Sequence, residues 1–110
     1  VYVSAPDGRL AGMSKDPQQL DGPVSGELVG ITRVSMALSE LMMAIAAEAF
    51  RESLRFDYET DCLVAAGRSR PIACPLVADL CWAEIDDPAH LERARSTVYP
   101  EILRRSRWPG

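Results

Sequence analysis

The sequence predicts an α/β domain, with a partial mixed sheet and flanking helices. Two short apolar segments surround the turn signal Asp7-Gly8, as in a strand hairpin. A long segment after Ser35 repeats apolar residues at helical spacing, and a later apolar run ends in acidic residues before Pro88. Strands that alternate with helices are typical of α/β folds, and 110 residues suffice for one small domain or a piece of a larger one.

The first third of the chain reads mainly as strand. Residues 1–4 form the first predicted strand, and residues 9–13 return beside it after the turn. Residues 15–23 are polar and contain two prolines, so they are a loop. Residues 27–34 are mostly apolar, as in a strand that is covered on both faces.

Ser35 is a good N-cap for a helix that we expect to reach about residue 56. Its inner face carries apolar residues at helical spacing: Leu38, Leu41, Met42, Ile45, Ala49 and Phe50. Its solvent face carries charged residues: Glu40, Glu48, Glu52 and Arg55.

The rest of the chain reads as shorter elements. A helix is expected from Tyr58 to about residue 66, followed by a basic turn and two candidate strands at residues 72–76 and 79–85. Asp87 followed by Pro88 is a favourable helix start. Pro100 is expected to break or kink that helix.

Composition excludes some classes of protein. The net charge of -4 argues against binding nucleic acid through bulk positive charge. No apolar run approaches the roughly 20 residues that cross a bilayer, and we see no signal peptide, so we expect a cytoplasmic protein. Three cysteines without a Cys-x-x-Cys pair favour reduced core thiols over a redox or metal role.

Carboxylates at the end of the last predicted strand suggest a metal site. Glu84 and Asp86 lie two apart, so in a strand their side chains share one face. Paired carboxylates at a strand tip suit Mg²⁺, which completes its shell with water and phosphate oxygens. The alternative is that these acids only stabilise the positive end of the following helix.

Two further groups of residues are candidates for substrate binding. Lys15 lies in a loop, where a lysine can contact a phosphate, although most loop lysines contact only water. Glu27, at the start of a predicted strand, could receive a substrate or be a surface charge. The acids near Tyr58, which are Glu59 and Asp61, could contact substrate or stabilise a helix start.

The order of these segments resembles the C-terminal half of a sugar-phosphate-type nucleotidyltransferase, nearest the phosphocholine and phosphonate cytidylyltransferases. The resemblance covers residues 1–94. Its motifs are the turn leading to Lys15, Gly26-Glu27-Leu28-Val29-Gly30, Tyr58-Glu59-Thr60-Asp61, and Trp82 to Asp87 before Leu91 and Ala94. It implies the second half of a Rossmann-like domain.

The resemblance also implies an activity and roles for the candidate residues. Such enzymes transfer CMP from CTP to a phosphorylated or phosphonate acceptor and release pyrophosphate. Asp86 would be the second Mg²⁺ ligand, with Glu84 beside it, and Lys15 would approach the phosphates or the transferring group. The acceptor would meet four residues: Glu27, Tyr58, Glu59 and Asp61.

The sequence departs from the family in one respect. The glycine-rich nucleotide loop and the partner aspartate of the metal site are absent from these 110 residues. We therefore expect residues 1–110 to be the acceptor half of a longer parent, for which a fusion to a phosphoenolpyruvate mutase is a reasonable guess. The chain alone would then be inactive, or would associate with further copies. The alternative is a non-catalytic α/β interaction or regulatory domain.

Overall fold

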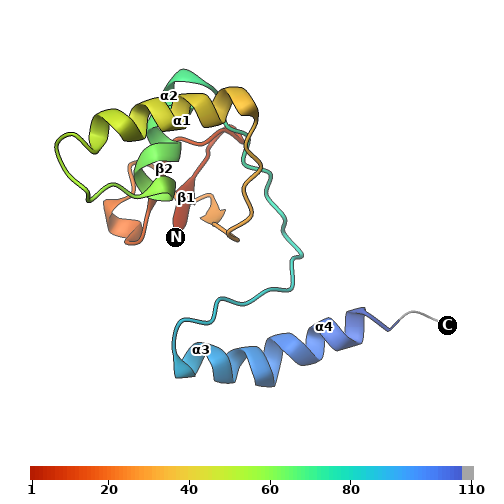
Figure 1. Ribbon diagram of the computed structural model, residues 1–110. Coiled ribbons are helices and arrows are strands. Elements are labelled where there is room, and N and C mark those ends of the chain that lie inside the picture. Colours follow the sequence, from red (N-terminus) through yellow and green to blue (C-terminus); the bar gives the residue numbers. More distant parts are fainter. Residues whose placement is uncertain (108–110) are drawn as a thin grey trace. The chain divides into compact units, whose positions relative to one another are not determined.

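A computed structural model describes residues 1–107 of the chain. The chain divides into two compact units, Val1–Leu76 and a second unit that begins at Val77. The first unit combines helices with a three-stranded sheet, which confirms a mixed α/β composition (Figure 1). Every pairing in this sheet is antiparallel, so the described residues show no mixed sheet.

The central strand of the sheet is β1 (Tyr2–Ser4), flanked by β2 (Gly12–Ser14) and β3 (Gly26–Glu27). Val3 pairs with Met13 on one side and with Gly26 on the other. The predicted turn is present, because Gly8 has a φ of 71° and its N–H donates to the Ala5 carbonyl at 3.0 Å. The first predicted strand is confirmed, whereas the second, predicted at residues 9–13, is shifted to Gly12–Ser14.

The predicted strand at residues 27–34 is wrong beyond Glu27. Leu28 donates one more backbone hydrogen bond, to the Val1 carbonyl at 2.9 Å. Gly30 then has a φ of 82°, in the left-handed region, which interrupts an extended chain. Residues 31–34 are exposed, so the apolar sequence there did not indicate burial between two layers.

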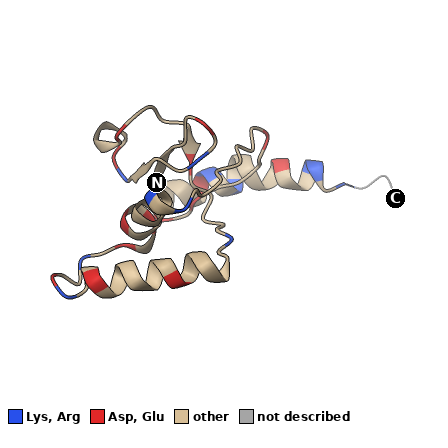
Figure 2. Cartoon of the chain, turned by 90° about the horizontal axis from the view of Figure 1, so that it is seen from above, with Lys and Arg blue, Asp and Glu red and all other residues tan. Residues whose placement is uncertain are grey.

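Helix α1 (Met36–Ala49) begins as predicted, because the Ser35 hydroxyl accepts a hydrogen bond from the Leu38 N–H at 3.1 Å. It ends about seven residues before the predicted end, where the Phe50 ring meets Phe56 edge-to-face with centroids 5.9 Å apart. On its inner face only Leu38 is fully buried. Glu40 and Glu48 are its only charged residues (Figure 2).

The next helix starts with a π turn, η2 (Tyr58–Leu63), and continues as α2 (Val64–Ser69). Its N-cap is Asp57, one residue before the predicted start. The predicted basic turn after residue 66 is wrong at its beginning, because Gly67–Ser69 is still helical. Ala73 makes a single antiparallel bridge to Arg9 in place of the predicted strand at residues 72–76.

The core of the first unit lies between the sheet and the helices. Leu63 is 1 % exposed and belongs to a buried cluster with Val3, Ala5 and Leu10. Met42 of α1 packs against this cluster. The core therefore connects η2 to β1, which fixes the position of the helix start beside β2.

A short 3₁₀ helix, η1 (Pro17–Gln19), follows β2 and is capped by Asp16. The loop after it lies close to the sheet, because a Cβ added at Gly22 would come within 2.9 Å of the Ser4 hydroxyl oxygen. Gly22 also has a φ of 104°, so both space and backbone conformation require glycine there.

The second unit is one continuous helix preceded by an extended segment, residues 77–87. The helix comprises α3 (Pro88–Arg93), a π turn η3 (Ala94–Val98) and α4 (Tyr99–Arg105). Asp87 caps it as predicted, accepting a hydrogen bond from the His90 N–H at 2.8 Å. None of the described residues of this unit is fully buried.

The helix continues through Pro100, so the predicted break is wrong, while the predicted alternative of a kink stays a prediction. A proline removes one backbone donor and crowds the preceding turn. The wider π turn at Ala94–Val98 lies immediately before α4. It accommodates the missing donor and the proline ring without ending the helix.

The predicted strand at residues 79–85 is wrong, because the structure shows no strand in the second unit among the residues it describes. A strand needs a neighbouring strand to satisfy its N–H and C=O groups, and none lies beside this segment within its unit. No described helix is long and apolar enough to span a membrane.

The three cysteines are free thiols. Cys62 is buried, and its thiol contacts the Met42 carbonyl with a sulfur–oxygen distance of 3.4 Å. Burial raises the pKa of the Cys62 and Cys74 thiols, and thiols that stay protonated are poor nucleophiles. Of the three predicted core thiols, Cys62 is fully buried, whereas Cys74 and Cys81 are partly exposed.

Candidate functional site

An open depression of about 490 Å³ lies where the end of β2 meets the first turn of η2. Its lining is mostly polar and comes from two separate stretches of sequence: Met13, Ser14, Lys15, Asp16 and Gln19 from the first, and Thr60 and Asp61 from the second. The antiparallel pairing of β2 with β1, and the packing of Leu63 against β1, bring these stretches together.

Lys15 and Asp61, two of the residues predicted for a substrate site, both line this depression. Lys15 is the only lysine in the chain. Within the described part of the chain its ammonium forms no ion pair within 4.0 Å. The ammonium is therefore available to a ligand, whereas one oxygen of the Asp61 carboxylate already accepts a hydrogen bond within the helix start.

The other predicted acceptor residues lie elsewhere. Tyr58 and Glu59 belong to the same turn as Asp61 but do not line the depression. The Tyr58 hydroxyl donates a hydrogen bond to the Glu59 carboxylate, and this bond is the main cause that raises the pKa of Tyr58. Glu27 lies on β3, on the opposite side of β1 from β2.

Asp57 completes the turn that carries Thr60 and Asp61. One carboxylate oxygen of Asp57 accepts hydrogen bonds from the Glu59 N–H at 2.8 Å and the Thr60 N–H at 3.1 Å. The Asp57 N–H donates to the Asp61 carboxylate at 2.8 Å. The two aspartates therefore hold each other across the first helical turn.

The carboxylate of Asp57 is also within electrostatic range of Lys15. The N–H groups of Thr60 and Glu59 are the main causes that lower the pKa of Asp57, and the positive charge of Lys15 lowers it further. Asp57 is thus ionised at neutral pH.

The two predicted metal ligands, Glu84 and Asp86, lie in the exposed extended segment of the second unit. The Asp86 N–H donates to the His90 imidazole at 3.4 Å, while neither carboxylate accepts a hydrogen bond from a described residue. Without a strand, alternation no longer places the two side chains on one face. The residues that the structure describes contain no group of three or more potential ligands arranged to hold a metal ion.

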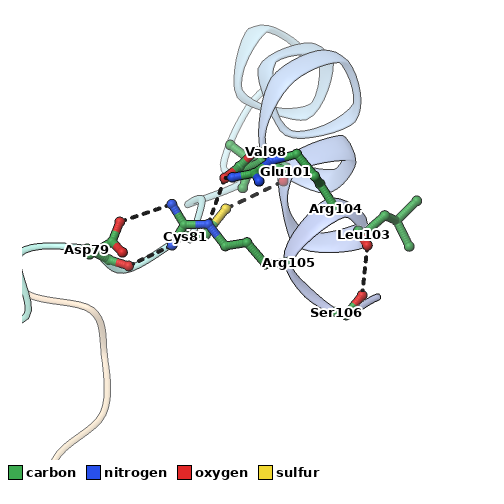
Figure 3. A network of polar contacts seen from close by, with 8 residues as sticks. All are labelled: Asp79, Cys81, Val98, Glu101, Leu103, Arg104, Arg105 and Ser106. Carbon is green, nitrogen blue, oxygen red and sulfur yellow. Dashed lines mark hydrogen bonds and ion pairs between the residues drawn. The ribbon is translucent and has the colours of Figure 1, made fainter. Parts of the chain in front are cut away.

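Side-chain contacts attach this extended segment to the helix that follows it (Figure 3). Arg105 donates to the Asp79 carbonyl at 2.9 Å and to the Asp79 carboxylate at 3.0 Å. The Cys81 thiol lies 3.6 Å from the Val98 carbonyl. Glu101 pairs with Arg104 and Arg105, whose hydrogen bonds lower the pKa of Glu101 to about 2.

Sequence reasoning missed Asp57, Asp16 and Thr60. Two of them could have been predicted as helix N-caps from the sequence. Asp16 directly precedes Pro17, a residue favoured at the first helical position, and Asp57 lies two and three residues before the N–H groups that it caps. Thr60 had no such signal, since only the tertiary fold brings it to Lys15.

A comparison with known protein families finds no family that matches this chain.

Proposed function

We propose that this chain is the acceptor-binding half of a nucleotidyltransferase, within a longer polypeptide. The enzyme would transfer CMP from CTP to a phosphonate or phosphocholine-like acceptor and release pyrophosphate. The observation that supports this best is the common depression of Lys15 and Asp61, because the resemblance assigns Lys15 to the phosphates or the transferring group and Asp61 to the acceptor that must meet it.

The depression contains one cation, Lys15, and two carboxylates, Asp16 and Asp61, so the phosphate or phosphonate group of a small acceptor would lie against Lys15. Lys15 offers a positive charge to such a group, and the side chains of Ser14, Gln19 and Thr60 offer further hydrogen-bonding atoms. Asp61 offers a carboxylate at the same cavity for a hydroxyl or amine of the acceptor.

The proposed reaction needs positioning more than a side-chain nucleophile. An oxygen of the acceptor forms a bond to the α-phosphorus of CTP, and the bond from that phosphorus to the bridging oxygen of pyrophosphate breaks. Residues of this chain would hold the acceptor and orient its attacking oxygen, while Lys15 offsets negative charge. The nucleotide pocket would be supplied by the other half of the enzyme.

Glu84 and Asp86 have the donor chemistry that Mg²⁺ prefers, and no described residue occupies their carboxylates. They would hold the ion together with water, phosphate oxygens and a ligand from the other half. When bound, Mg²⁺ would neutralise charge on the transferring phosphate.

The acceptor site can be tested on the chain itself by isothermal titration calorimetry with phosphocholine, aminoethylphosphonate and hydroxyethylphosphonate. We expect one of these to bind, and Lys15→Gln to weaken its binding about tenfold, which corresponds to about 1.4 kcal/mol. Arg33→Gln is the matched control, because Arg33 is an exposed cation that does not line the depression.

The activity is tested by pyrophosphate release from the longer polypeptide with Mg²⁺, CTP and the same acceptors. We expect release that requires an acceptor and is lost in Asp86→Asn, with Asp7→Asn as the control for removing an exposed carboxylate. If folded protein binds no acceptor and releases no pyrophosphate, the non-catalytic interaction domain becomes the better interpretation.

A further inference from the structure

The outer face of helix α1, which points away from the core of the first unit, is unusually apolar. Met36 and Met43 on this face are 77 % and 70 % exposed. The only charged residues within α1 are Glu40 and Glu48 (Figure 2). A helix that covers a core normally carries charges on its other face, and a helix that is apolar all round is normally buried. The flexible methionine side chain also adapts well to an apolar partner surface. The outer face of α1 therefore has the composition of an interface.

The two ends of this face carry groups of opposite charge. Glu40 lies near the start of α1 and forms no ion pair within 4.0 Å among the described residues. Arg51 lies in the turn that continues α1, because its N–H donates to the Glu48 carbonyl at 3.2 Å. The Arg51 guanidinium also contacts the Glu48 carboxylate at 3.2 Å, and both side chains are 75 % exposed. A guanidinium has several donors, so Arg51 can bind a second carboxylate.

This arrangement of charges is complementary to a second copy of itself. Glu40 and Arg51 are separated by about three helical turns, so both lie on the same side of the helix. Two identical subunits usually meet across a two-fold axis, which requires a self-complementary surface. When two α1 helices pack antiparallel, Glu40 of each copy meets Arg51 of the other. Ala44 and Ala47 then lie midway, where small exposed side chains let the helices approach closely.

We infer that the outer face of α1 is an interface between two copies of this chain, whose α1 helices pack antiparallel. Ala44 and Ala47 lie at the crossing, and Glu40 of each copy pairs with Arg51 of the other. This inference goes beyond the proposed function, because no residue of α1 lines the candidate acceptor depression.

The oligomeric state of the whole chain tests this inference, measured by sedimentation equilibrium over a range of concentrations. We expect a monomer–dimer equilibrium that Ala44→Glu weakens about tenfold, because this change buries an unpaired charge at the crossing. Ala44 is exposed in the single chain, so the change should leave the fold intact. Ala89→Glu is the matched control, since Ala89 is an exposed helical alanine of the second unit. It should leave the dissociation constant unchanged.

Charge reversal tests the antiparallel pairing itself. Glu40→Arg or Arg51→Glu alone brings like charges together twice in the dimer and should raise the dissociation constant about tenfold. The double variant, Glu40→Arg with Arg51→Glu, restores opposite charges and should return the constant to within about threefold of its original value. General damage to α1 would not be rescued in this way. Circular dichroism shows whether each variant is folded, and the reversal series carries the test if Ala44→Glu is not.

Three results would overturn the inference. The first is a chain that stays monomeric at every concentration. The second is a dimer that Ala44→Glu and the single reversals leave unchanged, because the copies would then meet at another face. The third is a dimer that the single reversals weaken and the double variant does not restore, because the helices would then not pair as described. Acceptor binding is measured separately by calorimetry, so the proposed function can fail while this inference holds, and the reverse.

Discussion

The two units of this chain are stabilised in different ways. The first unit surrounds a buried apolar cluster, in which Leu63 is 1 % exposed and contacts both the sheet and the helices. The second unit has no fully buried residue among those described, and the contacts that attach its extended segment to the helix include the hydrogen bonds of Arg105 to Asp79. Apolar burial is worth more than exposed ion pairs, so we expect the first unit to be far more resistant to unfolding.

This difference bears on the two candidate sites. The depression with Lys15 lies on the unit with a core, so its residues are held by packing and by backbone hydrogen bonds. Glu84 and Asp86 lie on a segment without backbone pairing. The carboxylates on such a segment need contacts from other residues before their relative positions are fixed.

The largest expected effect comes from the core of the first unit. Leu63→Ala should lower the free energy of unfolding by about 2–5 kcal/mol, because it removes apolar contacts and leaves a cavity. Chemical denaturation followed by circular dichroism measures this loss. Leu103→Ala, in the second unit at 46 % exposure, is the control and should cost less than about 0.5 kcal/mol. Equal losses would mean that the two units do not differ as described.

A smaller effect is expected at the start of η2. Asp57→Ala removes the acceptor for the Glu59 and Thr60 N–H groups and should cost about 1 kcal/mol. Asp57→Asn keeps an acceptor and should cost much less. Thermal unfolding of both variants measures the difference, and a cost as large for asparagine as for alanine would show that the charge is essential to the fold.

The same residue gives a pH dependence with a definite sign. Because the folded-state pKa of Asp57 is below its ordinary value of 3.8, its contribution to stability is fully present above that pH. The contribution is lost as the pH falls further, through the lowered pKa. Asp57→Asn should lack this part of the acid transition, which is measured by the unfolding midpoint between about pH 5 and pH 2. Identical acid profiles would contradict the assignment.

In the second unit, removal of Arg105 should change local opening and not global stability. Arg105→Gln loses the contacts to Asp79 and Glu101, so the NMR backbone order parameters of residues 79–87 should fall. The denaturation midpoint of the first unit should not move. Arg107→Gln is the control, since Arg107 is exposed and forms no contact with these residues. Unchanged order parameters would mean that other contacts hold the segment.

The smallest effect concerns Glu101, whose pKa is lowered to about 2 from an ordinary value of 4.5 by hydrogen bonds from Arg104 and Arg105. Its stabilisation of the helix end is complete above pH 4.5 and is lost as the pH falls towards about 2. Carbon NMR of the side-chain carboxylate measures the midpoint directly. High salt should raise this midpoint, because screening weakens exposed pairs. A midpoint near 4.5 at low salt would contradict the pairing.

Most of the features that were predicted correctly are helix caps and turns, which depend on residues close together in the sequence. Ser35, Asp87 and the turn at Gly8 were predicted from residue type alone, because a cap or a tight turn depends on atoms a few residues apart. The first strand and the start of α1 were also predicted from residues that are close together in the sequence. Lys15 and Asp61 were singled out by motif resemblance, without any indication from local chemistry that they share a cavity.

Only the tertiary structure decided which apolar segments are paired and which acids meet Lys15. Residues 27–34 and 79–85 have strand-like composition, but a strand exists only where a neighbour supplies hydrogen bonds. The residues that the structure describes supply none to either segment beyond Glu27 and Leu28. In the same way, the packing of Leu63 against β1 brings Thr60 and Asp61 to the depression that Lys15 lines. The sequence by itself determined the caps and turns, whereas long-range packing determined the sheet and the candidate site.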